Sequence, residues 1–141
     1  MFKPICLAAL TVTLAGCALG IDGSGQGPRA SAEVDRPAEA VLDTAQAQAL
    51  QCLTGNSAYE VQRVQGQAGQ GSILVRAPFT TNDMARVDVT TLSANRSKVD
   101  IVMWGRSIWD ASAVRAMQDA VTFGVTSCKA YMPVAAPRQT K

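Results

Sequence analysis

The stretch RVDVTTLSANRSKVDIVMW, residues 86–104, decides the fold that the sequence predicts. Apolar and polar residues alternate on both sides of the turn-forming residues 93–95, and a period of two is typical of a half-buried strand. The apolar positions would face a core: Val87, Val89, Val99, Ile101 and Met103. The polar positions between them would face water: Arg86, Asp88, Lys98 and Asp100. The short separator indicates that the two strands are antiparallel neighbours.

Two further strand-like runs lie upstream, at residues 59–65 and 72–77, and residues 66–71 and 78–83 between the runs have turn composition. The two strands of the opening stretch are expected at 86–92 and 98–104. Because all three separators are short, the four strands are expected to form an antiparallel meander. This sheet would be the centre of the domain.

A helix is expected on each side of these strands. The first begins at Pro37 with Asp35 as a candidate cap and ends at Gly55, since Pro favours the first turn and Gly the end. The second extends from Asp110 to Cys128, with apolar residues repeating every three or four positions. The fold class is therefore α+β, with the order α-β-β-β-β-α and both helices packed on one face of the sheet.

Composition narrows the functional classes. The 141 residues are 48% hydrophobic and 17% charged, which is typical of a single globular domain. The net charge is only +2 and the sequence has no basic stripe, so a nucleic acid is not an expected partner. The chain has no histidine, which removes the commonest general base and the commonest metal ligand.

The first residues have the pattern of a removable export leader. A positively charged start at Lys3 precedes an apolar run of about ten residues, too short for the ~20 residues that a membrane-spanning helix needs. The run ends in Leu14-Ala15-Gly16-Cys17. This motif resembles the bacterial lipobox. The resemblance implies that signal peptidase removes the leader before Cys17 and that Cys17 carries a diacylglyceryl thioether. The resemblance implies a protein held by its lipid at an envelope membrane, facing the periplasm.

The expected organisation follows from this reading. Residues 1–16 form the signal peptide, and residues 17–36 the lipidated cysteine and a flexible tether rich in Gly, Ser and Ala. Residues 37–130 form the single domain, and 131–141 a loose tail with two prolines. The residue after the cysteine is Ala18. In lipoproteins of this kind an aspartate at that position favours inner-membrane retention, so the resemblance implies the outer membrane as the location.

As a whole, the chain is similar to small bacterial envelope lipoproteins that carry one α-β4-α domain behind a lipobox and a short tether. The element order also resembles the α/β domains of lipoprotein subunits that assist outer-membrane assembly machines. Both resemblances concern the fold and carry little weight for function.

Two cysteines remain after Cys6 leaves with the leader and Cys17 is lipidated. Cys52 and Cys128 would lie near the ends of the two helices in an oxidising compartment, which favours a disulfide between them. Two buried free thiols are the alternative. In a strict four-stranded meander the two cysteines would lie at opposite ends, too far apart for a bond.

No catalytic constellation, metal site or cofactor is predicted. Asp88 and Asp100 lie beside Arg86 and Lys98 on alternating strands, which predicts solvated cross-strand ion pairs. A serine nucleophile has no histidine to activate it, and no loop carries the closely spaced acids of a calcium site.

The segment 103–109 holds both tryptophans. Its candidate partner contacts are Trp104, Arg106, Ile108 and Trp109, since Trp and Arg are favoured interface anchors. The alternative is that these residues close one end of the core.

The sequence thus predicts a non-enzymatic, membrane-anchored lipoprotein that acts as an adaptor or structural component of the envelope, with a protein partner. The alternatives are an enzyme that acts on peptidoglycan through carboxylates and a carrier of a small ligand. A cleft with two carboxylates would favour the enzyme, and a sizeable apolar cavity would favour the carrier.

Overall fold

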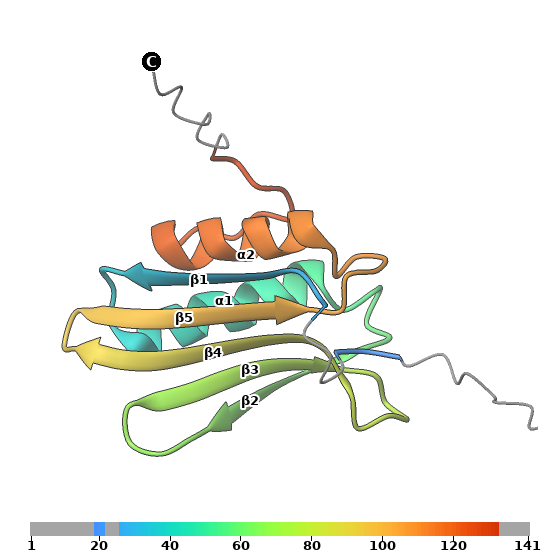
Figure 1. Cartoon of the computed structure of the whole chain (residues 1–141), viewed down its shortest axis with the longest axis horizontal. Coiled ribbons are helices and arrows are strands. Elements are labelled where there is room, and N and C mark those ends of the chain that lie inside the picture. The colour runs from blue at the N-terminus through green and yellow to red at the C-terminus, as the bar shows by residue number, and fades with distance from the viewer. Residues whose placement is uncertain (1–18, 22–25, 133–141) are drawn as a thin grey trace, which may run out of the picture.

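The computed structural model describes residues 19–21 and 26–132 (Figure 1). It contains five strands and two helices, in the order β1 (Arg29–Val34), α1 (Ala38–Cys52), β2 (Glu60–Gln65), β3 (Gln70–Arg76), β4 (Asp83–Ser93), β5 (Arg96–Met103) and α2 (Ala111–Phe123). The strands form one antiparallel sheet with the spatial order β1-β5-β4-β3-β2, and α1 connects its two edge strands.

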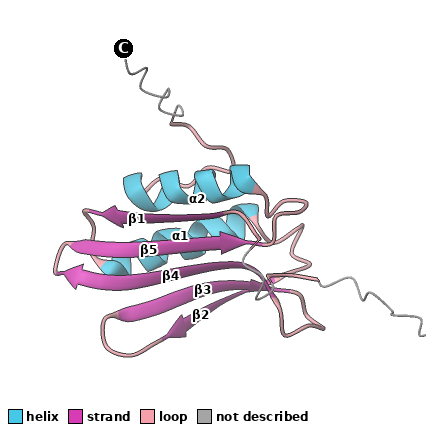
Figure 2. Cartoon of the chain, viewed as in Figure 1, coloured by secondary structure: helices cyan, strands magenta, loops and turns pink. Residues whose placement is uncertain are grey.

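Both helices pack on the same side of the sheet, and no helix of the described residues covers the other side (Figure 2). The core between helices and sheet is one cluster, built from the alternate residues of the strands and from the apolar stripe of each helix. The fold class α+β and the two helices are therefore as predicted.

Residues 86–103 lie in the hairpin β4–β5. Val87 lies opposite Ile101, and Val89 lies opposite Val99. All four side chains are buried against the helices, as the period-two pattern predicts.

The prediction of four strands is wrong by one. Residues 29–34, which the sequence analysis assigned to the flexible tether, form β1, and Ala32 lies opposite Val99 of β5. Ala30, Ala32 and Val34 do alternate with polar residues, but alanine contributes little apolar area, so the pattern is weak. Pairing with the edge of β5 makes this segment a strand.

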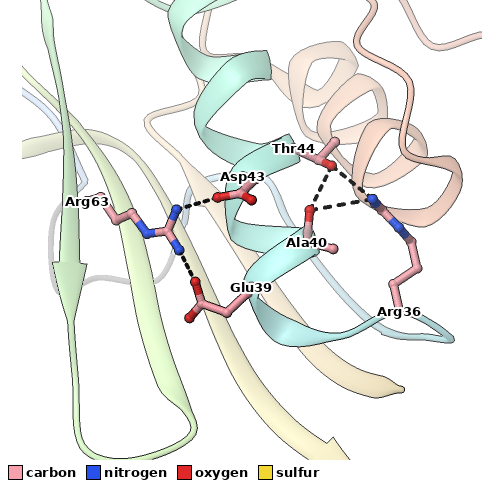
Figure 3. Close-up of polar contacts among 6 residues, drawn as sticks. All are labelled: Arg36, Glu39, Ala40, Asp43, Thr44 and Arg63. Carbon is pink, nitrogen blue, oxygen red and sulfur yellow. Dashed lines mark hydrogen bonds and ion pairs between the residues drawn. The ribbon is translucent and has the colours of Figure 1, made fainter. Parts of the chain in front are cut away.

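The start of α1 is held by a side chain that the sequence analysis did not single out. Asp35, the expected cap, contacts Arg96 instead, and no side chain caps the helix. The Arg36 guanidinium donates to the Thr44 hydroxyl at 3.1 Å (Figure 3) and to the backbone oxygen of Val121 in α2 at 2.8 Å. Arg36 therefore joins the two helices.

The edge strand β2 is tied to α1 by a second arginine. Arg63 donates to Asp43 at 2.6 Å and to Glu39, one helical turn earlier (Figure 3). Both carboxylates are largely exposed, so this pair of ion pairs contributes little to stability and mainly orients the strand beside the helix.

The second helix is shorter than expected. Asp110 caps its start, as predicted, by accepting from the backbone N–H of Ala113. The helix ends at Phe123 rather than at Cys128, because Gly124 has a φ of 75° in the left-handed region that favours glycine at a helix end. The chain then turns back toward the end of α1.

If β1 is part of the domain, Val34→Asp should lower the free energy of unfolding by about 3 kcal/mol, since Val34 is only 2% exposed and a carboxylate there would be buried without a partner. Urea unfolding of the mature domain measures this. Glu33→Gln, at the exposed neighbouring position, should change the same quantity by less than about 1 kcal/mol. Equal and small effects would show that residues 29–34 are a free tether.

Candidate functional site

The predicted lipidation site lies outside the described residues. Cys17 and the lipobox belong to residues 1–18, and the last nine residues of the predicted tail, 133–141, are also outside the described part of the chain. Three regions of the described residues could form a site: the segment 103–109, the space between the two helices, and the side of the sheet that the helices do not cover.

The structure divides the four candidate partner contacts. Trp109 is 2% exposed, its indole N–H donates to the backbone oxygen of Leu53, and its ring forms a T-shaped pair with Tyr59 at 4.5 Å between centroids. Trp109 therefore closes the core, and its prediction as a partner contact is wrong. The local sequence could not show this, because the acceptor that satisfies the indole comes from the end of α1.

The other three candidate partner contacts remain accessible. Trp104 is half-buried, and the guanidinium of Arg106 lies 5.7 Å from the centre of its ring, in cation–π contact. Ile108 is 39% exposed. The three residues belong to the connection between β5 and α2, and this connection lies at one end of the sheet (Figure 1).

A disulfide joins Cys52 and Cys128, whose Cα atoms are 5.2 Å apart. The objection raised by the strict meander does not apply, because the chain reverses at Gly124 and brings Cys128 back to the end of α1. The buried side chain of Gln48 lies beside the bridge. Its amide accepts from the backbone N–H of Ser127 at 2.9 Å and donates to the oxygen of the same residue at 2.7 Å.

This Gln48 contact is a further element that sequence reasoning missed. A glutamine on the apolar stripe of a helix is a usable signal, since a buried amide needs hydrogen-bond partners. What the amide binds depends on a segment 79 residues away. The Gln48 amide pairs with the backbone of Ser127 as a neighbouring strand would, and it holds residues 125–128 against α1.

A cavity of about 330 Å³ opens between the C-terminal end of α1 and the N-terminal end of α2. Its lining mixes apolar and polar groups: Gln48, Cys52, Leu53, Ser107, Ile108, Asp110, Ser112, Ala113, Ala116, Met117 and Cys128. Asp110 is committed to its helix, because hydrogen bonds from the Ala113 backbone and then from the Ser112 hydroxyl hold its pKa below the usual value. A carboxylate held in this way is a poor proton donor near neutral pH.

The helix-free face of the sheet carries a polar ladder. We use this name for the side chains of Ser31, Ser72, Arg86, Asp88, Lys98 and Asp100. Asp88 on β4 lies directly opposite Asp100 on β5, an arrangement of like charges that is unfavourable without compensation. The compensation is present: Arg86 binds Asp88 at 2.8 Å, and Lys98 binds Asp100 at 3.3 Å.

Hydroxyl groups complete the ladder on both sides. Ser72 on β3 donates to Asp88 at 2.5 Å, and Ser31 on β1 donates to Asp100 at 2.6 Å. The hydrogen bond that Arg86 itself donates to Asp88 raises the pKa of the Arg86 guanidinium. The predicted cross-strand ion pairs thus lie within each strand instead, and the ladder is a row of fixed donors and acceptors across four strands.

A hollow of about 410 Å³ lies beside this ladder, lined by Ile21, Arg29, Ala30, Ser31, Asp88, Asp100, Ile101 and Val102. Ser31 belongs to β1, and Ile21 precedes that strand. The hollow therefore exists only because residues expected in the tether join the domain.

Metal and membrane-span patterns are both lacking in residues 19–21 and 26–132. No three His, Cys, Asp or Glu side chains of this part of the chain gather where they could hold a metal ion. No helix within it is long and apolar enough to cross a membrane.

Comparison with known proteins adds no family. No family model and no curated protein matches the chain. Among solved structures, the Zhui aromatase/cyclase from Streptomyces sp. R1128 is similar over 66% of this chain and 81% of its own, with 13% identity and a TM-score of 0.22. A likeness at this level carries no argument about what this chain does.

Peptide mapping of the unreduced mature protein should recover the Cys52 and Cys128 peptides as one linked species. The double variant Cys52→Ser/Cys128→Ser should lose about 4 kcal/mol of unfolding free energy, since the bond closes a long loop in the unfolded chain. Recovery of both cysteines as alkylated free thiols would contradict this prediction.

Proposed function

We propose that this protein is a non-enzymatic lipoprotein of the bacterial envelope that presents its domain to a protein partner at a membrane surface. The observation that carries the proposal is the sequence Leu14-Ala15-Gly16-Cys17 behind a short charged and apolar leader. A lipobox in this position directs acylation of the cysteine, and two or more acyl chains anchor a protein stably. Ala18 favours the outer membrane, with the domain facing the periplasm.

The helix-free face is the surface that we assign to the partner. Neither α1 nor α2, the helices of residues 19–21 and 26–132, covers this side of the sheet (Figure 2), and the polar ladder offers aligned carboxylates, cations and hydroxyls there. Rows of fixed donors and acceptors favour a polar protein surface over an apolar ligand, since charged groups across an interface give specificity through complementarity.

One observation supports a second candidate, an enzyme that hydrolyses glycan strands. Asp88 and Asp100 lie opposite each other beside the 410 Å³ hollow, and glycosidases use such pairs of carboxylates. The adaptor is the better supported function, because each of the two carboxylates is bound by a cation and by a hydroxyl group. Such contacts are typical of a structural role rather than of acid–base catalysis. A small-ligand carrier is less favoured, since polar groups interrupt the lining of the cavity between the helices.

Cys17→Ser should abolish incorporation of labelled fatty acid and leave the protein as an unprocessed precursor or release it from envelope membranes. Cys6→Ser is the matched control, since this cysteine lies inside the leader and should be dispensable. Labelling, precursor processing and membrane fractionation are the measurements. If Cys17→Ser fractionates like the parent and the parent carries no fatty acid, the lipoprotein proposal fails.

A photo-crosslinking amino acid at position 98, on the helix-free face, should capture one discrete envelope protein in living cells. The same group at position 47, an exposed site on α1, should capture it at least about tenfold less, because the two positions lie on opposite sides of the molecule. Lys98→Glu should weaken capture from a second position on the helix-free face, Thr90, which lies opposite Lys98. Equal capture from positions 47 and 98 would contradict this assignment of the partner surface.

A further inference from the structure

Three segments gather at one end of the sheet (Figure 1). They are residues 19–21, the connection 77–82 between β3 and β4, and the connection 104–109 after β5, and we call them together the anchor end. The backbone N–H of Ile21 donates to the oxygen of Asp83 at 2.7 Å, and the side-chain amide of Asn82 donates to the oxygen of Leu19 at 2.8 Å. Trp104 donates its backbone N–H to Met84 at 2.9 Å.

The contact of residues 19–21 with the domain is close. Gly20 has a φ of 96°, and a Cβ atom at this position would lie 2.8 Å from Cβ of Asn82 and 2.9 Å from the oxygen of Asp83. A side chain would therefore meet both a strained backbone and occupied space. The glycine allows the segment to lie directly against the start of β4, so the described part of the expected tether is attached to the domain at both its beginning and its end.

This attachment limits how far the domain can lie from the lipid. Leu19 follows Cys17 by two residues, and two residues span at most about 7 Å. If Cys17 carries the lipid, as the proposed function requires, the Cα atom that bears the lipid lies within that distance of Leu19, so the acyl chains enter the bilayer close to the anchor end. The anchor end then faces the membrane, and the long tether expected from the sequence is absent.

The anchor end has the side chains that a bilayer surface favours. Phe79 is 89% exposed, the largest exposed fraction among the large apolar side chains of the described residues, and it lies in the connection that binds Leu19. Leu19 and Ile108 are 36% and 39% exposed. Arg106 stacks on Trp104 nearby, and aromatic and basic side chains are favoured at the headgroup level.

We propose that the connection 77–82 inserts Phe79 into the same bilayer leaflet that holds the lipid on Cys17. The two contacts together fix the orientation of the domain, with the anchor end down and the helix-free face directed sideways toward a partner. This inference rests on the proposed lipidation of Cys17. Because the acyl chains alone anchor the protein, the insertion changes orientation and depth rather than the fraction bound.

The test places one tryptophan in the connection 77–82 and, in a second protein, one at the opposite end of β4, both in the full-length lipidated protein. Phe79→Trp reports on the anchor end. Leu92→Trp is the matched control, because Leu92 is also an exposed apolar residue, 47% accessible, near the end of β4 that lies away from the anchor end. Both proteins are reconstituted into phosphatidylethanolamine–phosphatidylglycerol vesicles, with and without bromine on the acyl chains. The emission of the parent protein, from Trp104 and Trp109, is subtracted.

We expect brominated acyl chains to quench the added emission of Phe79→Trp about twofold and to leave that of Leu92→Trp unchanged, since only the first side chain would reach the acyl region. Flotation with the vesicles is measured in parallel. If both proteins float and position 79 is quenched no more than position 92, the insertion of Phe79 is refuted while the lipid anchor stands. If the lipidated protein does not float, the proposed function and this inference both fail.

Discussion

The backbone pairing of β1 with β5 is the contact on which the rest of the structure depends. It draws residues 29–34 out of the expected tether and makes them an edge of the sheet. The chain then crosses the whole sheet as α1 to reach the opposite edge at β2. Arg36, at the corner between β1 and α1, consequently lies where its guanidinium can bind both helices. Without this pairing, α1 would have no fixed starting point, and the hollow beside the polar ladder would lose one wall.

The helical layer is closed by contacts between segments far apart in the chain. Gly124 ends α2 and turns the chain back, Gln48 binds the returning backbone of Ser127, and the disulfide of Cys52 follows directly. Each contact depends on the one before it, because the bond requires Cα atoms within about 6 Å and a helix continuing past residue 123 would carry Cys128 away. The disulfide therefore depends on the turn at Gly124. The two helices cover only one side of the sheet.

The two proposals use different parts of this frame. The anchor end gathers Phe79 and the segment that leads to Cys17, whereas the helix-free face holds the charged ladder of Asp88 and Asp100. A protein held by its lipid and by one inserted side chain would present that ladder at a constant height above the bilayer. Orientation of this kind favours an adaptor, because a partner on the same membrane then meets its binding surface without a search in three dimensions.

The sequence by itself determined the strands β2 to β5, the existence of both helices and the candidate lipid site, since alternation, helical periodicity and a four-residue motif are all local. Only the tertiary structure decided that residues 29–34 form a strand, that Trp109 is buried and that Cys52 meets Cys128. Each of these depends on a partner supplied by a distant segment: the edge of β5, the carbonyl of Leu53 and the chain returning after Gly124. Local periodicity reports which side of an element is apolar, but pairing and burial follow from how the elements meet in space.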